Sequence, residues 1–296
     1  MNLISPLTTP SRFDAIQHAL TEACYGRAKL FSDRSFSETL DKLLDDALAG
    51  GKILSLDVFD TLVLRDNSSE LTRFYEIGKR MAEIVYDRSG RQVTQVDAFA
   101  ARYLGTKATY RASATVRGCR EGSLSELHKT ASWILSGSPI LAEAFIEAEL
   151  TYEATRITSN PWLWAYVDRY IEKGGRVVLV SDMYMHAPQI VTLLDKIGWQ
   201  RSKDVLLVSS ADTKVSKASG GIFGLIETSF KAAPSDFIHL GDSLKGDMVQ
   251  PVRNGWGAIH LPLASYDIAQ RQADHFATVG MLKDKFGLLV DIALPR

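Results

Sequence analysis

Acidic side chains end the apolar segments of this sequence. The segment LSLDVFDTLVL, residues 54–64, places Asp57 and Asp60 in a run of residues typical of a buried strand. Chemically active side chains also follow the later apolar segments: Ser181 and Asp182, then Lys214 and Lys217, and finally Asp242 and Asp247. In open α/β sheets the ligand lies beyond the carboxyl ends of the strands. We therefore expect acids from two strands, a hydroxyl from a third and a lysine from a fourth to converge on one pocket.

These residue types indicate phosphoryl chemistry. Clustered carboxylates repel one another unless a cation lies among them, and hard oxygen ligands favour Mg²⁺. An aspartate can attack phosphorus to form an aspartyl-phosphate, which divides a difficult hydrolysis into two easier steps. Ser181 and Lys217 could then hold the phosphoryl oxygens and neutralise developing charge.

The elements that must position these side chains follow from the apolar pattern. Short valine- and leucine-rich segments that do not alternate with polar residues predict strands buried on both faces: 52–58, 176–182, 204–210, 237–243 and 257–262. Helical segments connect the later strands, and Asn160 and Pro161 mark the start of one of them. Alternating strands and helices predict an α/β fold with a doubly wound parallel sheet.

The interval between the first two strands carries helical pattern only. Residues 66–158 keep apolar residues at helical spacing, so we expect a separate all-helical cap inserted after the first strand. Ser35 and Glu38 match a capping box, which predicts an N-terminal helical segment. The expected organisation is an N-terminal helical segment over 1–48, an α/β core over 49–65 and 159–296, and a cap over 66–158.

Composition narrows the class of protein. The chain has 296 residues, of which 46% are hydrophobic and 23% charged, with a net charge of −1. This balance gives no general attraction to nucleic acid or to an anionic membrane. Cys24 and Cys119 are too few for a disulfide framework. With neither a signal-peptide pattern nor an apolar run long enough to span a membrane, we expect a cytoplasmic, soluble protein.

Four motifs carry a family resemblance. The segments DVFDT, VLVSD, a lysine before ASGGIF, and GDSLKGD occur in the order of the haloacid dehalogenase (HAD) superfamily of hydrolases, and the chain resembles that family over roughly 50–65 and 160–265. The resemblance implies that Asp57 is the nucleophile and a Mg²⁺ ligand. It implies the Phe59 backbone carbonyl and the Asp242 carboxylate as further ligands. Asp247 would act through a metal-bound water or by orienting the lysine.

The same resemblance implies a phosphate site. Thr61, Ser181 and Lys217 are the implied phosphate-binding residues, and Lys217 is preferred to Lys214 because KASGGIF keeps the family spacing. Asp182 belongs to this side of the site, where we expect it to orient the loop that follows Ser181. The implied Rossmann-like HAD fold and the inserted cap agree with the elements expected from the apolar pattern.

A narrower likeness suggests a substrate class. SLDVFDTLVLR and VSDMY resemble HAD domains found beside glycosyltransferases in bacterial capsule and surface-polysaccharide systems. This implies a small phosphorylated substrate, such as a sugar phosphate, a nucleotide or a polysaccharide precursor, and a glycosyltransferase as a partner.

Phe59 departs from the phosphatases of the family. Their general acid usually stands at this position, whereas here an aspartate, Asp60, follows one residue later. Asp60 is either a substitute acid or a cap of the next loop. General acid catalysis is typically worth about 10²–10⁴-fold, so its loss leaves two alternatives to a phosphatase: a dehalogenase-like hydrolase and a non-catalytic phosphosugar-binding module.

One stretch of the expected cap is basic. Residues 102–120 carry five basic residues and no acid, and Lys107 and Arg111 fall on one helical face. They either contact an anionic substrate as part of a lid or form a solvated basic face.

Overall fold

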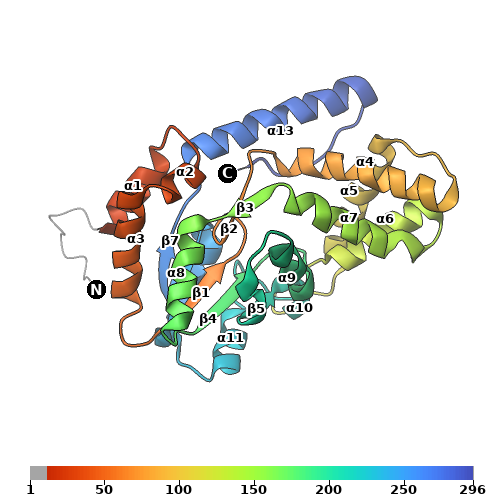
Figure 1. Ribbon diagram of the computed structural model, residues 1–296. Coiled ribbons are helices and arrows are strands. Elements are labelled where there is room, and N and C mark those ends of the chain that lie inside the picture. Colours follow the sequence, from red (N-terminus) through yellow and green to blue (C-terminus); the bar gives the residue numbers. More distant parts are fainter. Residues whose placement is uncertain (1–11, 296) are drawn as a thin grey trace.

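Five parallel strands form the central sheet of the molecule (Figure 1). The computed structural model describes residues 12–295, so residues 1–11 of the expected N-terminal segment and Arg296 lie outside the described residues. The strand order is β5-β4-β1-β6-β7. The strands are β1 (Ile53–Asp57), β4 (Val177–Ser181), β5 (Leu206–Ser209), β6 (Phe237–Gly241) and β7 (Gly257–His260). The prediction of an α/β fold with a doubly wound parallel sheet is confirmed.

Both faces of the sheet are buried at its three central strands, β1, β4 and β6, which explains their mostly apolar sequences. Leu54 and Leu56 of β1 belong to a large apolar cluster, whereas Ile53 belongs to a second one. Helices α8 (Pro161–Glu172) and α9 (Ala187–Lys196) pack into the first cluster, and α11 (Phe223–Phe230) packs into the second. Successive side chains of a strand point to opposite faces, so each face needs its own helical layer.

The start of α8 follows the sequence pattern. Pro161 occupies the first helical turn, and the Asn160 side chain accepts the backbone N–H of Leu163 at 3.3 Å. The same side chain donates to the backbone carbonyl of Thr61 at 2.9 Å. One asparagine therefore caps a helix and holds the loop that follows β1.

Helices fill the interval between β1 and β4. The chain leaves and re-enters the core through two short antiparallel strands, β2 (Val63–Arg65) and β3 (Ile157–Ser159). Between them lie α4 (Glu70–Ser89), α5 (Gln95–Ala112), α6 (Leu124–Ser136) and α7 (Ala142–Ala154). Figure 1 shows these four helices gathered beside the sheet, and we call them the helical insertion. Ser69, Thr94 and Ser123 cap α4, α5 and α6 by accepting backbone N–H groups.

Helices from both ends of the chain lie against this framework. They are α1 (Arg12–Thr21), α2 (Arg27–Phe31), α3 (Arg34–Ala47) and the long α13 (Ser265–Phe286). The capping box expected at Ser35 is wrong by two residues, because Asp33 caps α3 and accepts the N–H of Phe36 at 2.8 Å. Figure 1 shows α13 running from the neighbourhood of α2 towards α4. Its side chains bond to both: Asp267 accepts the Arg27 N–H, and Thr278 bonds Thr72.

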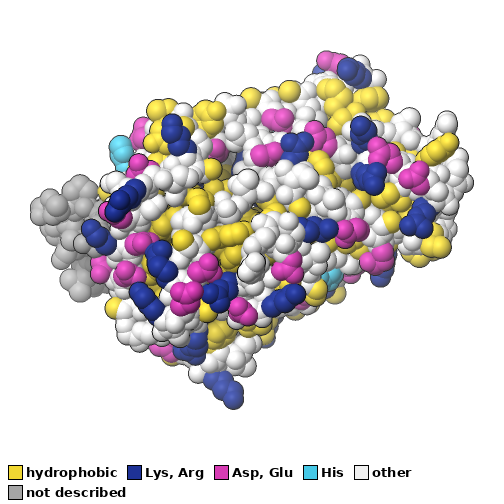
Figure 2. Space-filling model, viewed as in Figure 1, with side chains coloured by type: hydrophobic (Ala, Val, Ile, Leu, Met, Phe, Trp, Pro, Cys, Tyr) yellow, Lys and Arg dark blue, Asp and Glu magenta, His cyan; other side chains and the backbone are white. Residues whose placement is uncertain are grey.

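Short helices complete the connections. They are α10 (Ser210–Thr213), α12 (Gln250–Arg253), a π-helical turn over Leu244–Val249, and 3₁₀ turns over Pro139–Leu141, Gln200–Lys203 and Pro234–Asp236. On the face shown in Figure 2, basic and acidic side chains are interspersed, in keeping with the near-zero net charge. None of the helices in the described part of the chain has the length and apolar character needed to cross a membrane.

Candidate active site

A buried lysine joins two carboxylates at the carboxyl edge of the sheet. The Lys217 Nζ lies 2.5 Å from Asp57 Oδ1 and 2.6 Å from Asp247 Oδ1. Asp57 is the last residue of β1, and Asp247 lies in the π-helical turn after β6. Carboxylate oxygens of Asp57, Asp242 and Asp247 all lie within 4.8 Å of one another. The structure thus brings together four of the side chains that the sequence predicted to converge.

The loop that carries Lys217 is held by Asp182. One oxygen of this carboxylate accepts the Lys217 N–H at 2.7 Å, and the other accepts the Ala218 N–H at 3.0 Å. The Asp182 carboxylate is thus already used by backbone donors. We expected Asp182 to orient the loop that follows Ser181, and its carboxylate holds the loop that carries Lys217. Lys214, three to four residues before this contact, instead lies 3.9 Å from Glu126 of α6.

Asp247 is fixed from three directions. Its Oδ2 accepts the Ser243 N–H at 2.8 Å, and its Oδ1 lies 3.0 Å from His239 Nε2 as well as near Lys217. A carboxylate can only accept, so Nε2 of His239 carries the proton and Nδ1 accepts from Ser55, 2.7 Å away. His239 is fully buried with both ring nitrogens hydrogen-bonded, and it orients a residue of the cluster.

Gly241 is required by the close approach of Asp247. A Cβ at position 241 would lie 2.3 Å from the Asp247 carboxyl carbon, which no side chain permits. The π-helical turn that follows is a rare element found most often at functional sites. Together these features place the Asp247 carboxylate directly over the end of β6.

The cluster carries more negative charge than its lysine balances. Burial raises the pKa of the Asp57 carboxyl to about 7, against the opposing attraction of Lys217. Burial and the nearby Asp57 carboxylate raise the pKa of Asp242 well above its ordinary range. Asp247 behaves oppositely: burial is outweighed by Lys217 and His239, which hold its pKa well below the ordinary value. Asp57 and Asp247 therefore share the single Lys217 ammonium, and no ion pair is found for Asp242 among the described residues.

Hydroxyl groups line the same strand ends. The Thr61 Oγ1 is buried and has no hydrogen-bond partner among the described residues. Ser181, the last residue of β4, is buried and its Oγ accepts the Met183 N–H at 3.2 Å. An orphaned buried hydroxyl is costly, so Thr61 has the character of a group that binds a ligand oxygen.

The sequence matches no protein-family model and no curated protein. Solved structures of HAD hydrolases resemble parts of it. A 2-haloacid dehalogenase from Pseudomonas syringae pv. Tomato DC3000 is 13% identical, with 69% of this chain and 84% of that chain covered and a TM-score of 0.46. A HAD family enzyme from Bacteroides thetaiotaomicron, in complex with magnesium and inorganic phosphate, is 14% identical, with 71% and 94% covered and a TM-score of 0.45. An L-2-haloacid dehalogenase from Xanthobacter autotrophicus is 14% identical, with 69% and 75% covered and a TM-score of 0.39. At this level of similarity their activities remain statements about those proteins.

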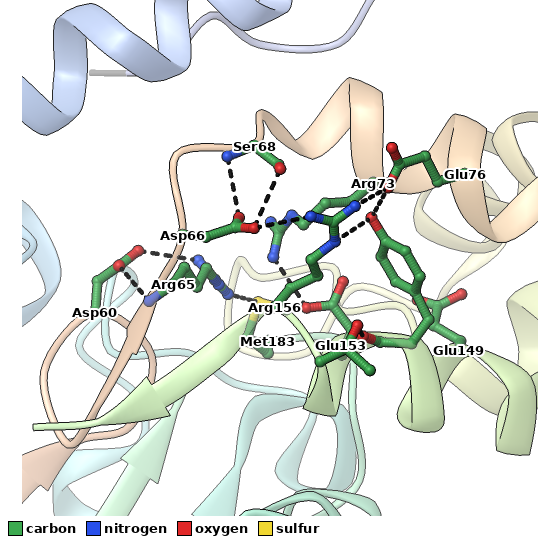
Figure 3. A network of polar contacts seen from close by, with 12 residues as sticks. Asp60, Arg65, Asp66, Ser68, Arg73, Glu76, Glu149, Glu153, Arg156 and Met183 are labelled. Carbon is green, nitrogen blue, oxygen red and sulfur yellow. Dashed lines mark hydrogen bonds and ion pairs between the residues drawn. The ribbon is translucent and has the colours of Figure 1, made fainter.

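Asp60 does not have the surroundings of a general acid. Arg271 donates to both of its carboxylate oxygens, at 2.9 and 2.7 Å. Arg65 donates to the same carboxylate at 3.3 Å (Figure 3). Burial alone would raise the pKa of Asp60, but the guanidinium groups of Arg271, Arg65 and Arg27 hold it far below the ordinary value. The carboxyl therefore has no proton to donate. Of the two roles left open for Asp60, substitute acid and loop residue, the contacts favour the second.

The Phe59 side chain supplies no proton donor either. It is buried, and the Arg65 guanidinium stacks 4.6 Å from the centre of its ring. Arg65 also donates to Met183 Sδ at 3.1 Å, so it connects the loop after β1 with the loop after β4 (Figure 3). No contact among the described residues offers the cluster a protonated carboxylic acid at this position.

Lys107 and Arg111 are not joined to the carboxylate cluster by any contact between described residues. Lys107 pairs with Asp291, beyond α13, at 3.0 Å, and Arg111 is exposed. Both line a cavity of about 330 Å³ between the helical insertion and the C-terminal segment, together with Phe74, Tyr110 and other residues. Their surroundings are compatible with either of the two readings left open for this basic stretch.

A buried network that the sequence did not reveal connects the insertion to the site. Tyr184, two residues after Asp182, donates to Glu149 of α7 at 3.0 Å. Arg102 of α5 donates to the same carboxylate and to the Tyr184 hydroxyl. A charged residue at a position where a helix pattern expects an apolar one indicates a buried, paired charge. Which side chain it meets depends on how α5 and α7 pack.

Proposed function

We propose that this chain is a magnesium-dependent hydrolase of the HAD type that releases phosphate through attack by Asp57. The observation that supports this most directly is the Lys217 ammonium between Asp57 and Asp247, with Asp242 alongside, at the carboxyl edge of a parallel sheet. The four sequence motifs in family order support the same proposal. The helical insertion would serve as its cap.

The residues present fit a divalent cation. Asp57 and Asp242 are hard oxygen ligands, Asp57 shares its one ammonium with Asp247, and Asp57, Asp242 and the Phe59 carbonyl would hold Mg²⁺ directly. Asp247 would act more remotely, because its oxygens are already engaged by Lys217, His239 and the Ser243 N–H. When bound, Mg²⁺ would neutralise the carboxylates and polarise the phosphoryl group.

The protein's own groups account for the remaining steps. Asp57 would attack phosphorus to form an aspartyl-phosphate, and water would later release phosphate from it. Lys217, held by Asp182 through its backbone, would balance negative charge on Asp57 and on the phosphoryl oxygens. The unpartnered Thr61 hydroxyl, with Ser181 on the next strand, would donate to those oxygens.

The missing acid determines which substrates should react well. With Phe59 apolar and Asp60 ionised by arginines, the leaving oxygen must depart largely unprotonated. Substrates whose leaving group is a weak base should therefore be preferred, such as acyl phosphates, phosphoanhydrides or acidic aryl phosphates. A phosphorylated sugar, nucleotide or polysaccharide precursor of this kind is the proposed class. Lys107 and Arg111 would contact an anionic group at the cavity described above.

A glycosyltransferase partner and cytoplasmic location remain proposals that rest on the sequence alone. A direct binding assay with a glycosyltransferase of the same genome would test the first of them.

The decisive experiment measures phosphate release from sugar phosphates, nucleotides, acyl phosphates and aryl phosphates, with and without Mg²⁺. The parent should release phosphate only with the metal, and Asp57→Asn should fall to background, because an amide neither attacks phosphorus nor binds Mg²⁺ well. Asp87→Asn, an exposed acid on α4, is the matched control. Substantial release by Asp57→Asn would refute the mechanism. Turnover of haloacids that survives chelation would favour a dehalogenase, and tight binding without release would favour a binding module.

A further inference from the structure

The backbone at Asp60 has an unusual conformation. Its φ is +60°, in the left-handed region that residues other than glycine seldom adopt. Aspartate tolerates this region better than most residues, yet glycine would meet the same φ without strain. An aspartate at such a position therefore needs a reason, and that reason must lie in its carboxylate.

Three arginines surround that carboxylate. Arg271 of α13 binds it in a bidentate geometry, donating to the two oxygens at 2.9 and 2.7 Å. Arg65 of β2 contributes its backbone N–H and a guanidinium N–H, both at 3.3 Å, and the Arg27 guanidinium lies 3.7 Å away. Asp60, Arg27 and Arg271 are all buried. We call these four residues the Asp60 clamp.

Each arginine also holds a second part of the site. Arg27 donates to the backbone carbonyl of Asp60 and, at 3.0 Å, to that of Leu261 after β7. Arg271 donates to the carbonyls of Arg65 and Asp66, where the chain leaves the core for the helical insertion. These bonds fix the backbone at the strained residue and after it, where the chain leaves the core.

Arg65 extends the same connections to the second strand. Its guanidinium stacks on the Phe59 ring. It also donates to Met183, the residue after Asp182 (Figure 3). Arg65 thereby fixes the distance between the loop after β1 and the loop after β4. Between Asp57 and the clamp lie only Val58 and Phe59, so a shift of the clamp must move the Phe59 carbonyl and Thr61.

We infer that Arg27 and Arg271 are positioning residues for the reaction at Asp57, acting through Asp60. The clamp holds residues 58–61 in the strained conformation that presents the Phe59 carbonyl and the Thr61 hydroxyl beside the nucleophile. Helices α2 and α13, from opposite ends of the chain, thus take part in building the site. The part of this inference that concerns catalysis rests on the proposed function, whereas the ordering of the loop does not.

Two variants separate positioning from acid catalysis. Asp60→Asn keeps the size and the tolerance of a positive φ but removes the charge, and Arg271→Lys keeps the positive charge but cannot bind both oxygens. Each should lower kcat by about 10- to 100-fold with KM nearly unchanged, the effect expected when reacting groups move by about 1 Å. The loss should be the same for aryl phosphates of high and low leaving-group pKa. The two variants combined should lose no more than the larger single loss, because both act through one contact.

Amide hydrogen exchange supplies a readout independent of turnover. The peptide spanning 58–66 should exchange faster in both variants than in the parent, while the peptide spanning 177–181 of β4 keeps its protection. Asp60→Gly, which meets the φ without strain, should still show faster exchange because the carboxylate is gone. Arg169 pairs with Asp41 on the surface, so Arg169→Lys is the matched control. It should change neither kcat nor the exchange of the peptide spanning 58–66.

The outcomes distinguish this inference from the proposed function. If Asp60→Asn loses most activity on poor leaving groups while Arg271→Lys does not, Asp60 is an acid and the clamp is refuted. Unchanged exchange and unchanged kcat in Arg271→Lys would refute it as well. If the parent releases no phosphate from any substrate, the proposed function fails, and faster exchange of 58–66 in both variants still supports the clamp.

Discussion

Replacing Glu149 by glutamine should destabilise the protein strongly, because this carboxylate is the centre of a fully buried network. It accepts Arg102 Nε at 2.8 Å, Arg102 Nη2 at 2.5 Å, His128 Nε2 at 2.8 Å and the Tyr184 hydroxyl at 3.0 Å. Arg102, Glu149 and His128 have no exposed surface. Glutamine keeps the size of the side chain but offers a single acceptor oxygen to four donor contacts.

The magnitude follows from the charge that remains. Glu149→Gln leaves the Arg102 guanidinium buried without a counter-ion, although its stacking 3.4 Å from the centre of the Phe74 ring persists. Breaking a buried ion pair by removing one partner costs about 3–5 kcal/mol. Because small proteins are stable by roughly 5–15 kcal/mol, this is a large share of the free energy of unfolding. Tyr184 lies two residues from Asp182, so kcat should fall as well.

Urea unfolding followed by circular dichroism measures the loss directly. Glu143→Gln, an exposed acid on the same helix, is the control and should change the free energy of unfolding by less than about 0.5 kcal/mol. Replacing both partners, Arg102→Met with Glu149→Leu, should recover much of the loss, because no unpaired charge then remains. A loss below about 1 kcal/mol for Glu149→Gln would contradict the reasoning.

Three further predictions concern the metal, the pH and the insertion. Mg²⁺ should raise the melting temperature of the parent by binding only the folded protein, and Asp242→Ala should remove the response; an equal response in both would place the metal elsewhere. Burial lowers the pKa of His128 below its ordinary 6.5, so the unfolded chain takes up a proton first and stability should fall by up to about 1.4 kcal/mol per pH unit below 6.5. Urea unfolding between pH 7.5 and 5.5 should show a shallower decline of the free energy of unfolding in His128→Gln than in the parent. Parallel curves of this free energy against pH would contradict the role of His128. Lys107→Ala should raise KM for an anionic sugar phosphate more than for a simple aryl phosphate; similar changes on both would leave it a solvated residue.

The fold and the convergence of the cluster could be predicted from the sequence because both depend on local pattern. Apolar runs that bury both faces specify parallel strands, and Asp57, Ser181 and Asp242 stand where such strands end. Parallel strands present their carboxyl ends at one edge, so residues far apart in sequence meet there whatever the intervening chain does. Lys217 could be chosen over Lys214 only through the family resemblance, because KASGGIF keeps the family spacing.

The partners of individual charges were decided by the tertiary structure. Arg27 lies 33 positions before Asp60 and Arg271 lies 211 positions after it, and nothing in their local sequence indicates that they meet. Lys107 likewise pairs with Asp291, 184 positions away. A helix pattern shows that a face is buried but not which surface covers it, and the ionisation of a buried acid depends on the charges brought to it by packing. The sequence therefore determined where Asp60 stands, whereas the packing of α2 and α13 decided that its carboxyl is held ionised.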